Sequence, residues 1–321
     1  MGYPRSKIVS KEEPGVYHIT TTCARKAYLC GYDALTNRDY EHRKGWIEER
    51  MIFLTEFFPV DIFSYGIMSN HYHMVLFVQP QLVQTWTDEE VARRWVHLSS
   101  AKKYLQSDGE DLKEKEIRRI LTAPAELKEL RERLSDLSWF MKSLNEYIAR
   151  KANKEDNCTG SFWEKRYHAQ SLLVAVAILV CMIYVDLNPI RAKVQNTPET
   201  SKFTGAYERI KALKSKKEQK AKHLLSLKES PLDLTDLEYL SLLDWTGRQI
   251  RVDKPGHIPH ELPPILERLQ INQNHWPKTI ESYGENSRAF FGTEPSMREM
   301  AHKLNKKWCV GVGFSKLAFL S

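Results

Sequence analysis

Hydrophobic and polar positions alternate most regularly between residues 58 and 78 of this 321-residue chain. The segment is rich in β-branched and aromatic residues and contains the small polar pair Ser69-Asn70, so it predicts two strands joined by a turn. Because successive side chains of a strand point to opposite faces, His71 and His73 share one face, while Tyr72 points into a core on the other.

Two further segments frame this hairpin. Residues 15–22 predict a first strand, and a helix is expected at about 39–57. After the hairpin, a highly charged stretch at about 87–134 reads as a helical insertion. Thr87-Asp-Glu-Glu90 at its start has the sequence of a capping box, in which the first and fourth residues satisfy each other's backbone N–H groups.

A second apolar segment lies at residues 169–188 and predicts a helix that ends at Asn188-Pro189, because proline disfavours helical geometry at the residue before it. Its unbroken apolar part runs from Leu172 to Val185, which is shorter than the about 20 residues that a membrane-spanning helix needs. Tyr184 and Asn188 are four residues apart, so they lie on one face of this helix.

Residues 231–321 read as a mostly helical region with a break at Pro263-Pro264, between a helix from Leu237 to Trp245 and another from Ile265 to Leu269. Ser296-Met-Arg-Glu299 is a second capping-box sequence and would open a basic helix that runs through Lys303, Lys306 and Lys307. The region is either a small DNA-reading domain or a helical module that packs on the rest of the chain or mediates dimerisation.

Charge adds a weak indication of a nucleic-acid partner. The chain carries 48 Lys and Arg against 41 Asp and Glu, a net charge of +7. Positive charge is densest in one short stretch, which reads either as a phosphate-tracking arm or as a solvated linker helix. This stretch contains Arg209, Lys211, Lys214, Lys216, Lys217, Lys220 and Lys222.

Cysteine usage and the lack of a targeting segment indicate the compartment. The five cysteines form no C-x-x-C pair, which argues against a disulfide scaffold or a zinc ribbon and for a reducing environment. Neither a signal peptide nor a membrane span is recognisable. We therefore expect a cytoplasmic, nucleoid-associated protein with no membrane partner.

The candidate chemistry lies in the hairpin and in the apolar helix. Two imidazoles at positions i and i+2 of a strand project in parallel and suit two ligands of one metal ion, although a half-buried strand can also carry hydrogen-bonded histidines. The phenol of Tyr184 and the amide of Asn188 could serve as a nucleophile and a third metal ligand. A core tyrosine beside a helix-ending Asn-Pro pair is the plainer alternative.

Three sequence motifs favour the catalytic interpretation over the structural one. They are Ser69-Asn-His-Tyr-His-Met-Val-Leu-Phe77, Gly160-Ser-Phe-Trp-Glu-Lys-Arg-Tyr167, and Tyr184-Val-Asp-Leu-Asn-Pro-Ile-Arg-Ala-Lys-Val194. In this order and spacing the chain resembles the HUH-type single-tyrosine transposases, in particular the REP-associated tyrosine transposases and their IS200-like insertion-sequence relatives. The resemblance covers roughly residues 15–207.

The resemblance implies an α+β fold, the ferredoxin-like HUH palm, with an antiparallel sheet and packed helices. Residues 1–207 would form the catalytic domain, interrupted by the insertion at about 87–134. Residues 208–230 would form a basic linker helix, and residues 231–321 a helical C-terminal domain of unknown role. Some members of the family act as dimers, so a homodimer is possible.

The resemblance also implies the roles of residues. His71 and His73 would hold Mg²⁺ or Mn²⁺, with Asn188 as third ligand in a position where better-known members carry glutamine. Tyr184 would attack single-stranded DNA at hairpin-containing sites and form a 5′-phosphotyrosine link. Three basic residues within these motifs would contact phosphates, namely Lys165, Arg166 and Arg191. Trp163 or Tyr167 would stack on bases. Trp163 could equally anchor the core.

Two other functions stay open at this stage. One is a catalytically inactive, domesticated DNA-binding protein, which would bind DNA without metal-dependent cleavage. The other is a metal-dependent nuclease without a covalent intermediate, in which Tyr184→Phe would keep cutting. Tyr147 is a second tyrosine in a helical segment, but it lies on an amphipathic helix with Trp139, Phe140 and Leu144, so packing explains it better than catalysis.

Overall fold

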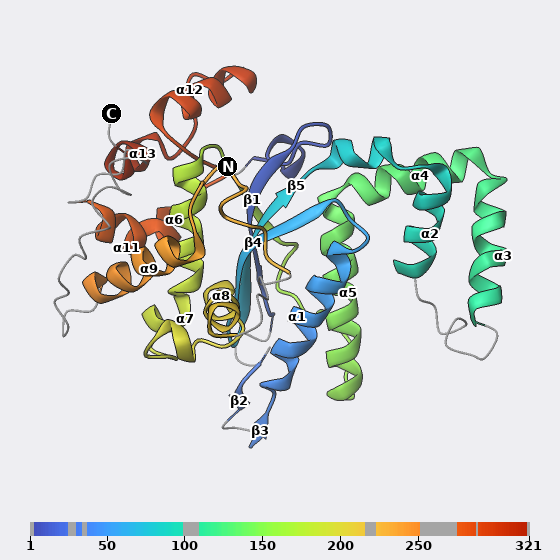
Figure 1. The fold of residues 1–321 in the computed structure, drawn as a ribbon, viewed down its shortest axis with the longest axis horizontal. Coiled ribbons are helices and arrows are strands. Elements are labelled where there is room, and N and C mark those ends of the chain that lie inside the picture. The colour runs from blue at the N-terminus through green and yellow to red at the C-terminus, as the bar shows by residue number, and fades with distance from the viewer. Residues whose placement is uncertain are drawn as a thin grey trace.

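A mixed five-stranded sheet lies at the centre of the protein, with helices on both faces (Figure 1). The computed structural model describes residues 3–24, 30–33, 37–98, 109–215, 223–250, 275–286 and 288–319. The sheet has the order β4-β5-β1-β6-β7, in which β7 is parallel to β6 and the other neighbours are antiparallel. Its strands are β1 (Gly15–Thr22), β4 (Val60–Ile67), β5 (His71–Val78), β6 (His168–Leu172) and β7 (Phe290–Phe291).

A separate two-stranded sheet pairs β2 (Tyr32–Asp33) with β3 (Arg38–Asp39). The helices before β6 are η1 (Arg5–Lys7), α1 (His42–Thr55), η2 (Pro80–Thr85), α2 (Asp88–Leu98), α3 (Gly109–Leu121), α4 (Pro124–Ser135) and α5 (Leu137–Glu155). The later helices are α6 (Ala175–Asp186), α7 (Asn188–Arg191), η4 (Pro198–Thr200), α8 (Gly205–Lys214), α9 (Asp236–Ile250), α11 (Trp276–Asn286), α12 (Glu294–Lys303) and α13 (Val312–Ala318). The predicted α+β class is confirmed.

The N-terminal half follows the sequence pattern closely. The first strand and the hairpin form where predicted, with the turn at Ser69-Asn70. The helix expected at 39–57 spans His42–Thr55. Helices α2, α3 and α4 occupy the charged insertion and lie beyond α5, away from the sheet (Figure 1). The capping box predicted at the start of this insertion forms only in part. The N–H of Glu90 donates to Thr87 Oγ1 at 3.1 Å, but the Glu90 carboxylate pairs with Arg94.

Both faces of the sheet are buried, each by a different layer of helices. Tyr17, Ile19 and Tyr72 point into a core shared with α1 and α5. Phe63 and Val75 point to the other side, into a core shared with α6, α9 and α11. The two-residue period of the strands therefore places His71 and His73 under α6 and not toward open solvent.

The helix predicted over residues 169–188 is wrong in its first part. Residues His168–Leu172 form β6, which pairs with β1 from Thr20 to Val16, and the helix begins only at Ala175. The residues of β6 are His-Ala-Gln-Ser-Leu, of which all but the last lie before the unbroken apolar run, and their pairing with β1 is not visible in the local sequence pattern. The helix also does not end at Asn188. It ends at Asp186, and α7 follows with Pro189 in its first turn, where the missing N–H costs nothing.

The described part of residues 231–321 is built onto the same sheet. Strand β7 extends its edge beside β6, and α9 and α11 share one hydrophobic core with α6 (Figure 1). The domain boundaries at 207 and 231 remain predictions. The expected helix from Leu237 to Trp245 lies within α9, whereas the break at Pro263-Pro264 and the helix at 265–269 lie outside the described residues.

The second predicted capping box is wrong. Helix α12 begins at Glu294, with Thr293 before it, so Ser296 lies inside the first turn and its hydroxyl donates to the Thr293 carbonyl at 2.9 Å. Pro295 in the same turn explains the earlier start, because proline is favoured at the beginning of a helix. Among the described residues, no helix is long and apolar enough to cross a membrane.

Candidate functional site

Polar side chains from two neighbouring strands meet on the face of the sheet that α6 covers. Thr20 of β1 lies directly opposite His73 of β5, and His18 is two positions earlier on the same strand face. On the other side of β5, Gly66 of β4 lies opposite His73. His73 therefore stands in the middle of the sheet, and its side chain is 5% exposed.

Both ring nitrogens of His73 have partners. Nδ1 lies 3.0 Å from His18 Nε2 and 3.1 Å from Thr20 Oγ1, while Nε2 lies 3.1 Å from Asn188 Nδ2. The Asn188 amide donates to Nε2, so the proton of the neutral imidazole sits on Nδ1. His73 therefore directs the lone pair of Nε2 toward α7.

His71 is oriented in the same manner. Its Nδ1 lies 2.6 Å from Asn70 Oδ1, an acceptor, so Nδ1 carries the proton and Nε2 keeps a lone pair. The rings of His71 and His73 lie nearly perpendicular, with their centroids 4.9 Å apart. Two neutral imidazoles thus project side by side from β5, as the spacing in the sequence predicts.

Asn188 reaches the sheet because α6 packs very closely on β4. A β-carbon at Gly66 would lie 3.0 Å from the Val185 carbonyl oxygen, so only glycine leaves the backbones this close without displacement. Val185 lies in the last turn of α6, between Tyr184 and the start of α7. The position of Gly66 therefore sets how near Tyr184 and Asn188 come to His73.

Tyr184 lies beside the histidines and is half-buried. Its ring centroid is 5.7 Å from that of His73 and 6.3 Å from that of His18. The guanidinium carbon of Arg191 lies 4.6 Å from the centre of the Tyr184 ring, so a fixed positive charge stands next to the phenol.

Helix α11 lies against the other side of Tyr184. The ring of Tyr283 is 5.0 Å from that of Tyr184, and a β-carbon at Gly284 would stand 2.4 Å from the Tyr184 hydroxyl oxygen. Arg191 is held by the same helix, since its guanidinium donates to the Glu281 carbonyl at 2.7 Å. The C-terminal region thus supplies part of the wall around the tyrosine.

The three histidines are neutral at physiological pH. Burial lowers the pKa of His18 to about 3 and that of His71 below its usual range. Burial also holds the pKa of His73 well below 6.5, and the nearby His18, His71 and Arg191 lower it further. Neutral imidazole is the form that binds metal ions.

The donor set fits a divalent cation. His71 and His73 each commit Nδ1 to a neighbouring group, which leaves Nε2 as the atom that would face a metal ion, the arrangement usual for metal-ligating histidines. The Nε2 lone pair of His73 accepts the N–H of the Asn188 amide here, so a bound ion would replace that hydrogen bond. Asn188 could add its amide oxygen, which is bonded to the same carbon as the Nδ2 that contacts His73. Within the described residues, no cluster of three His, Cys, Asp or Glu side chains offers a fuller set of ligands.

The structure separates the residues predicted to bind DNA. Arg191 lies at the tyrosine, and Lys165 and Arg166 are exposed just before β6. Trp163 lies on the α1/α5 side of the sheet, where its indole N–H donates to the Asn145 carbonyl at 2.8 Å and its ring packs edge-on against Tyr72. Of the two roles open for Trp163, this placement favours the core anchor.

Tyr167 and Arg209 also differ from their sequence interpretation. Tyr167 is buried, and its hydroxyl lies 3.1 Å from Ser138 Oγ, so its ring is not available for base stacking. Arg209 is buried, forms an ion pair with Asp236 and donates to the Phe63 carbonyl. It joins α8 to α9 and β4 and does not track phosphates. Lys216, Lys217, Lys220 and Lys222 lie outside the described residues.

Tyr147 is far from the histidines in the architecture, because α5 covers the opposite face of the sheet. Its side chain is 40% exposed, with Arg50 4.8 Å from the ring centre, so packing into a core is not its role. Tyr147 is therefore a natural control tyrosine for experiments on Tyr184.

Sequence reasoning missed His18 and Asp186. The side chain of Asp186 is fully buried and accepts hydrogen bonds from Ser64 Oγ and the Ala206 N–H, each at 2.9 Å, and from the Tyr239 hydroxyl. It fastens the end of α6 to β4, α8 and α9. The sequence alone could have placed His18 on the same strand face as Thr20, because the two residues are two positions apart on a predicted strand. That this face meets His73 is visible only in the register of the sheet.

Comparisons of the chain with models of protein families, with curated proteins and with solved structures found no match.

Proposed function

We propose that the protein cleaves and rejoins single-stranded DNA through a covalent link to Tyr184, as HUH-type single-tyrosine transposases do. The observation that carries the proposal is the convergence at His73. Residues more than a hundred positions downstream meet it there, with Asn188 Nδ2 at 3.1 Å and the Tyr184 ring at 5.7 Å. A structural histidine pair would not require a phenol, an amide and a guanidinium around it.

The covalent step is a transesterification. The Tyr184 oxygen bonds to phosphorus, the bond from phosphorus to the 3′ oxygen breaks, and the strand ends as a 5′-phosphotyrosine and a free 3′-hydroxyl. The proton that the phenol loses is balanced by the proton that the 3′ oxygen gains. Because one phosphate ester replaces another, a 3′-hydroxyl can reverse the attack and rejoin ends without ATP.

The surrounding residues have distinct roles in this proposal. Arg191 places positive charge beside Tyr184, where it would attract the phosphate and offset the negative charge that grows during attack. His71, His73 and Asn188 would hold Mg²⁺ or Mn²⁺. When bound, the ion would neutralise phosphate charge and help to orient the scissile group. His18 and Thr20 orient His73, and Asn70 orients His71.

The fold supports the same proposal at a coarser level. An HUH palm is an antiparallel sheet with helices packed on it, and β4, β5, β1 and β6 are antiparallel, with α1 and α5 on one face. We infer that these elements correspond to the palm, with β7, α9 and α11 as additions to it.

A covalent-adduct gel tests the proposal. Labelled single-stranded hairpin DNA from the flanks of the gene is incubated with the protein and Mg²⁺ or Mn²⁺. A denaturant-resistant protein–DNA band is expected, and Tyr184→Phe and His71→Ala should each abolish it. Tyr147→Phe is the matched control and should leave the band unchanged, because Tyr147 lies on the opposite side of the sheet.

The alternatives give different gels. DNA binding without an adduct under either metal would indicate an inactive DNA-binding protein. Cleavage products without an adduct, and unchanged cleavage in Tyr184→Phe, would indicate a nuclease that uses water as nucleophile. Loss of the band in Tyr147→Phe alone would show that the wrong tyrosine has been assigned.

A further inference from the structure

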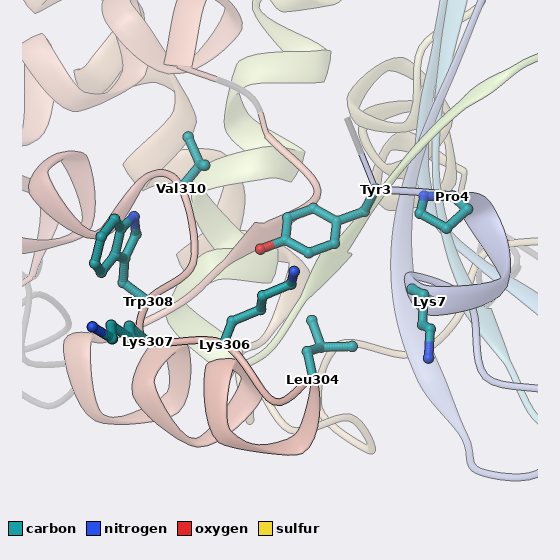
Figure 2. Close-up of a pocket in the computed structure, with 8 residues that line it drawn as sticks. All are labelled: Tyr3, Pro4, Lys7, Leu304, Lys306, Lys307, Trp308 and Val310. Carbon is teal, nitrogen blue, oxygen red and sulfur yellow. The ribbon is translucent and has the colours of Figure 1, made fainter. Parts of the chain in front are cut away.

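A groove of about 600 Å³ lies between the two ends of the described chain (Figure 2). One side consists of Tyr3 and the start of η1, and the other of the connection from α12 to α13. The volume lies within the about 300–1,000 Å³ typical of ligand pockets. The groove contains none of the residues assigned above to the DNA-cleaving site.

An exposed indole stands in this groove. The side chain of Trp308 is 67% exposed, and among the described residues no cation–π contact involves its ring. A similar groove beside α5 differs in this respect, because Lys142 lies 4.3 Å from the Trp139 ring centre and Arg50 lies 4.8 Å from that of Tyr147. Cations of the same groove cover the rings of Trp139 and Tyr147, whereas none of the described cations covers the ring of Trp308.

Positive charge lines the groove. Lys7, Lys306 and Lys307 line the groove and are exposed, and among the described residues none has a carboxylate within ion-pair distance. Lysines just beyond a helix are stabilised by the helix dipole, which accounts for positive charge after α12 but not for an exposed indole in a groove lined by three exposed lysines. An open aromatic face with a basic surround is the arrangement that binds single-stranded nucleic acid.

The groove lies on the α1/α5 side of the sheet, because Tyr3 and Leu304 pack against the core of that side, whereas Tyr184 packs against the α6 core on the other side. Arg5 of η1 lies 4.4 Å above the ring of Tyr167, and Tyr167 follows the exposed pair Lys165-Arg166. The next residue, His168, pairs with Thr20, which in turn pairs with His73. Two strand spacings, roughly 10 Å, therefore separate His168 from His73 along the sheet.

We propose that this groove is a second binding site for the single-stranded DNA substrate, on the other side of the sheet from Tyr184. One base stacks on Trp308, and Lys7, Lys306 and Lys307 contact the neighbouring phosphates. The choice of DNA as the nucleic acid rests on the function proposed above, while the recognition of an unpaired base and its backbone rests on the groove itself.

The test is fluorescence anisotropy of a labelled oligothymidylate with the full chain. Stacking contributes about 1–3 kcal/mol per base, so Trp308→Ala should weaken binding roughly 5- to 150-fold, and Trp308→Phe should restore much of it. Lys306→Gln and Lys307→Gln should each lower the slope of log affinity against log salt by about 0.7, the value for one contact to single-stranded DNA. Thermal unfolding should be unchanged in all four variants, because these side chains are exposed.

Tyr147→Ala is the matched control, since it removes an exposed aromatic side chain from the other basic groove, and it should bind as the parent does. Parental affinity in Trp308→Ala, or an equal loss in Tyr147→Ala, would overturn the second binding site. The adduct gel reports separately on cleavage. Loss of affinity in Trp308→Ala without any adduct from the parent would uphold the second binding site and reject the transposase chemistry.

Discussion

The hydroxyl oxygen of Tyr184 lies against the backbone of α11 at Gly284, where a β-carbon would stand only 2.4 Å away. Glycine inside a helix costs roughly 0.5–1 kcal/mol relative to alanine, so its presence in α11 needs a local reason. The reason is room for the phenol. The C-terminal region therefore fits closely around the tyrosine that we propose as nucleophile.

This contact predicts a coupling between the two residues. Gly284→Ala should destabilise the protein by about 1–3 kcal/mol, because the new methyl group displaces either Tyr184 or α11. In a Tyr184→Phe background the same change should cost less, since the nearest atom, the hydroxyl oxygen, is absent. Denaturant unfolding of the two single variants and the double variant measures this difference. Additive free energies of unfolding would show that the two residues are not in contact.

A second prediction concerns the approach of α6 to the sheet. Gly66→Ala places a methyl group 3.0 Å from the Val185 carbonyl oxygen, so α6 must move outward and carry Tyr184 and Asn188 away from His73. We expect a loss of about 1–3 kcal/mol in unfolding free energy and a lower yield of covalent adduct.

Gly45→Ala is the control for this substitution. Gly45 lies inside α1, and a β-carbon there would meet nothing within 4 Å. The substitution should stabilise the protein by up to about 1 kcal/mol through helix propensity and leave the adduct unchanged. Equal adduct yields in both glycine variants would contradict the role given to Gly66.

The sequence predicts the fold best where the pattern is local. Alternation of side chains over residues 58–78 is sufficient to place the hairpin, because each strand is a few residues long and its turn carries the expected polar pair. Residues 168–172 show the limit. Their sequence, His-Ala-Gln-Ser-Leu, does not by itself distinguish a helix from a strand, and the strand forms because β1 offers backbone partners from Val16 to Thr20. Such a partner lies outside any local window.

The candidate site divides in the same way. His71 and His73 are placed on one face by the strand period alone. Tyr184 and Asn188 do not lie on one continuous helix as predicted, because Tyr184 is in α6 and Asn188 begins α7, yet both approach His73. The contributions of His18, Gly66 and Gly284 depend on sheet register and on helix packing, which no segment of the sequence contains by itself. Trp163 and Arg209 show the converse, since an aromatic and a basic residue in a suggestive context support the fold here, Trp163 partly buried and Arg209 buried.

A third prediction tests the orientation of His71. Asn70 Oδ1 lies 2.6 Å from His71 Nδ1, and removal of such a partner typically costs 10- to 100-fold in metal affinity. Asn70→Ala should therefore weaken Mn²⁺ binding by about this factor in a calorimetric titration, and His71→Ala should weaken it further. His42→Ala, which removes a histidine that pairs with Glu155, should bind Mn²⁺ as the parent does. Parental affinity in Asn70→Ala would reject the proposed metal site or the role of Asn70 in it.

A fourth prediction concerns the buried carboxyl of Asp186. Burial raises the pKa of Asp186 from 3.8 to about 6, because the charged form is poorly solvated. The folded state thus holds a proton that the unfolded state has lost between these two pH values. The contribution of protonated Asp186 to the free energy of unfolding is fully present below about pH 4. It is lost as the pH rises through 6, a change of about 3 kcal/mol.

Asp186→Asn should remove this pH dependence. The asparagine oxygen can still accept from Ser64 and the Ala206 N–H, and its amide can donate to the Tyr239 oxygen, so the packing around it is preserved. Denaturant unfolding at pH 4 and pH 7 measures the free-energy difference between parent and variant, which should move in favour of the variant by about 3 kcal/mol at the higher pH. Asp88→Asn, at an exposed carboxylate paired with Arg131, is the control and should show no such change. A constant difference between parent and Asp186→Asn at the two pH values would mean that Asp186 is already ionised in the folded protein at pH 4.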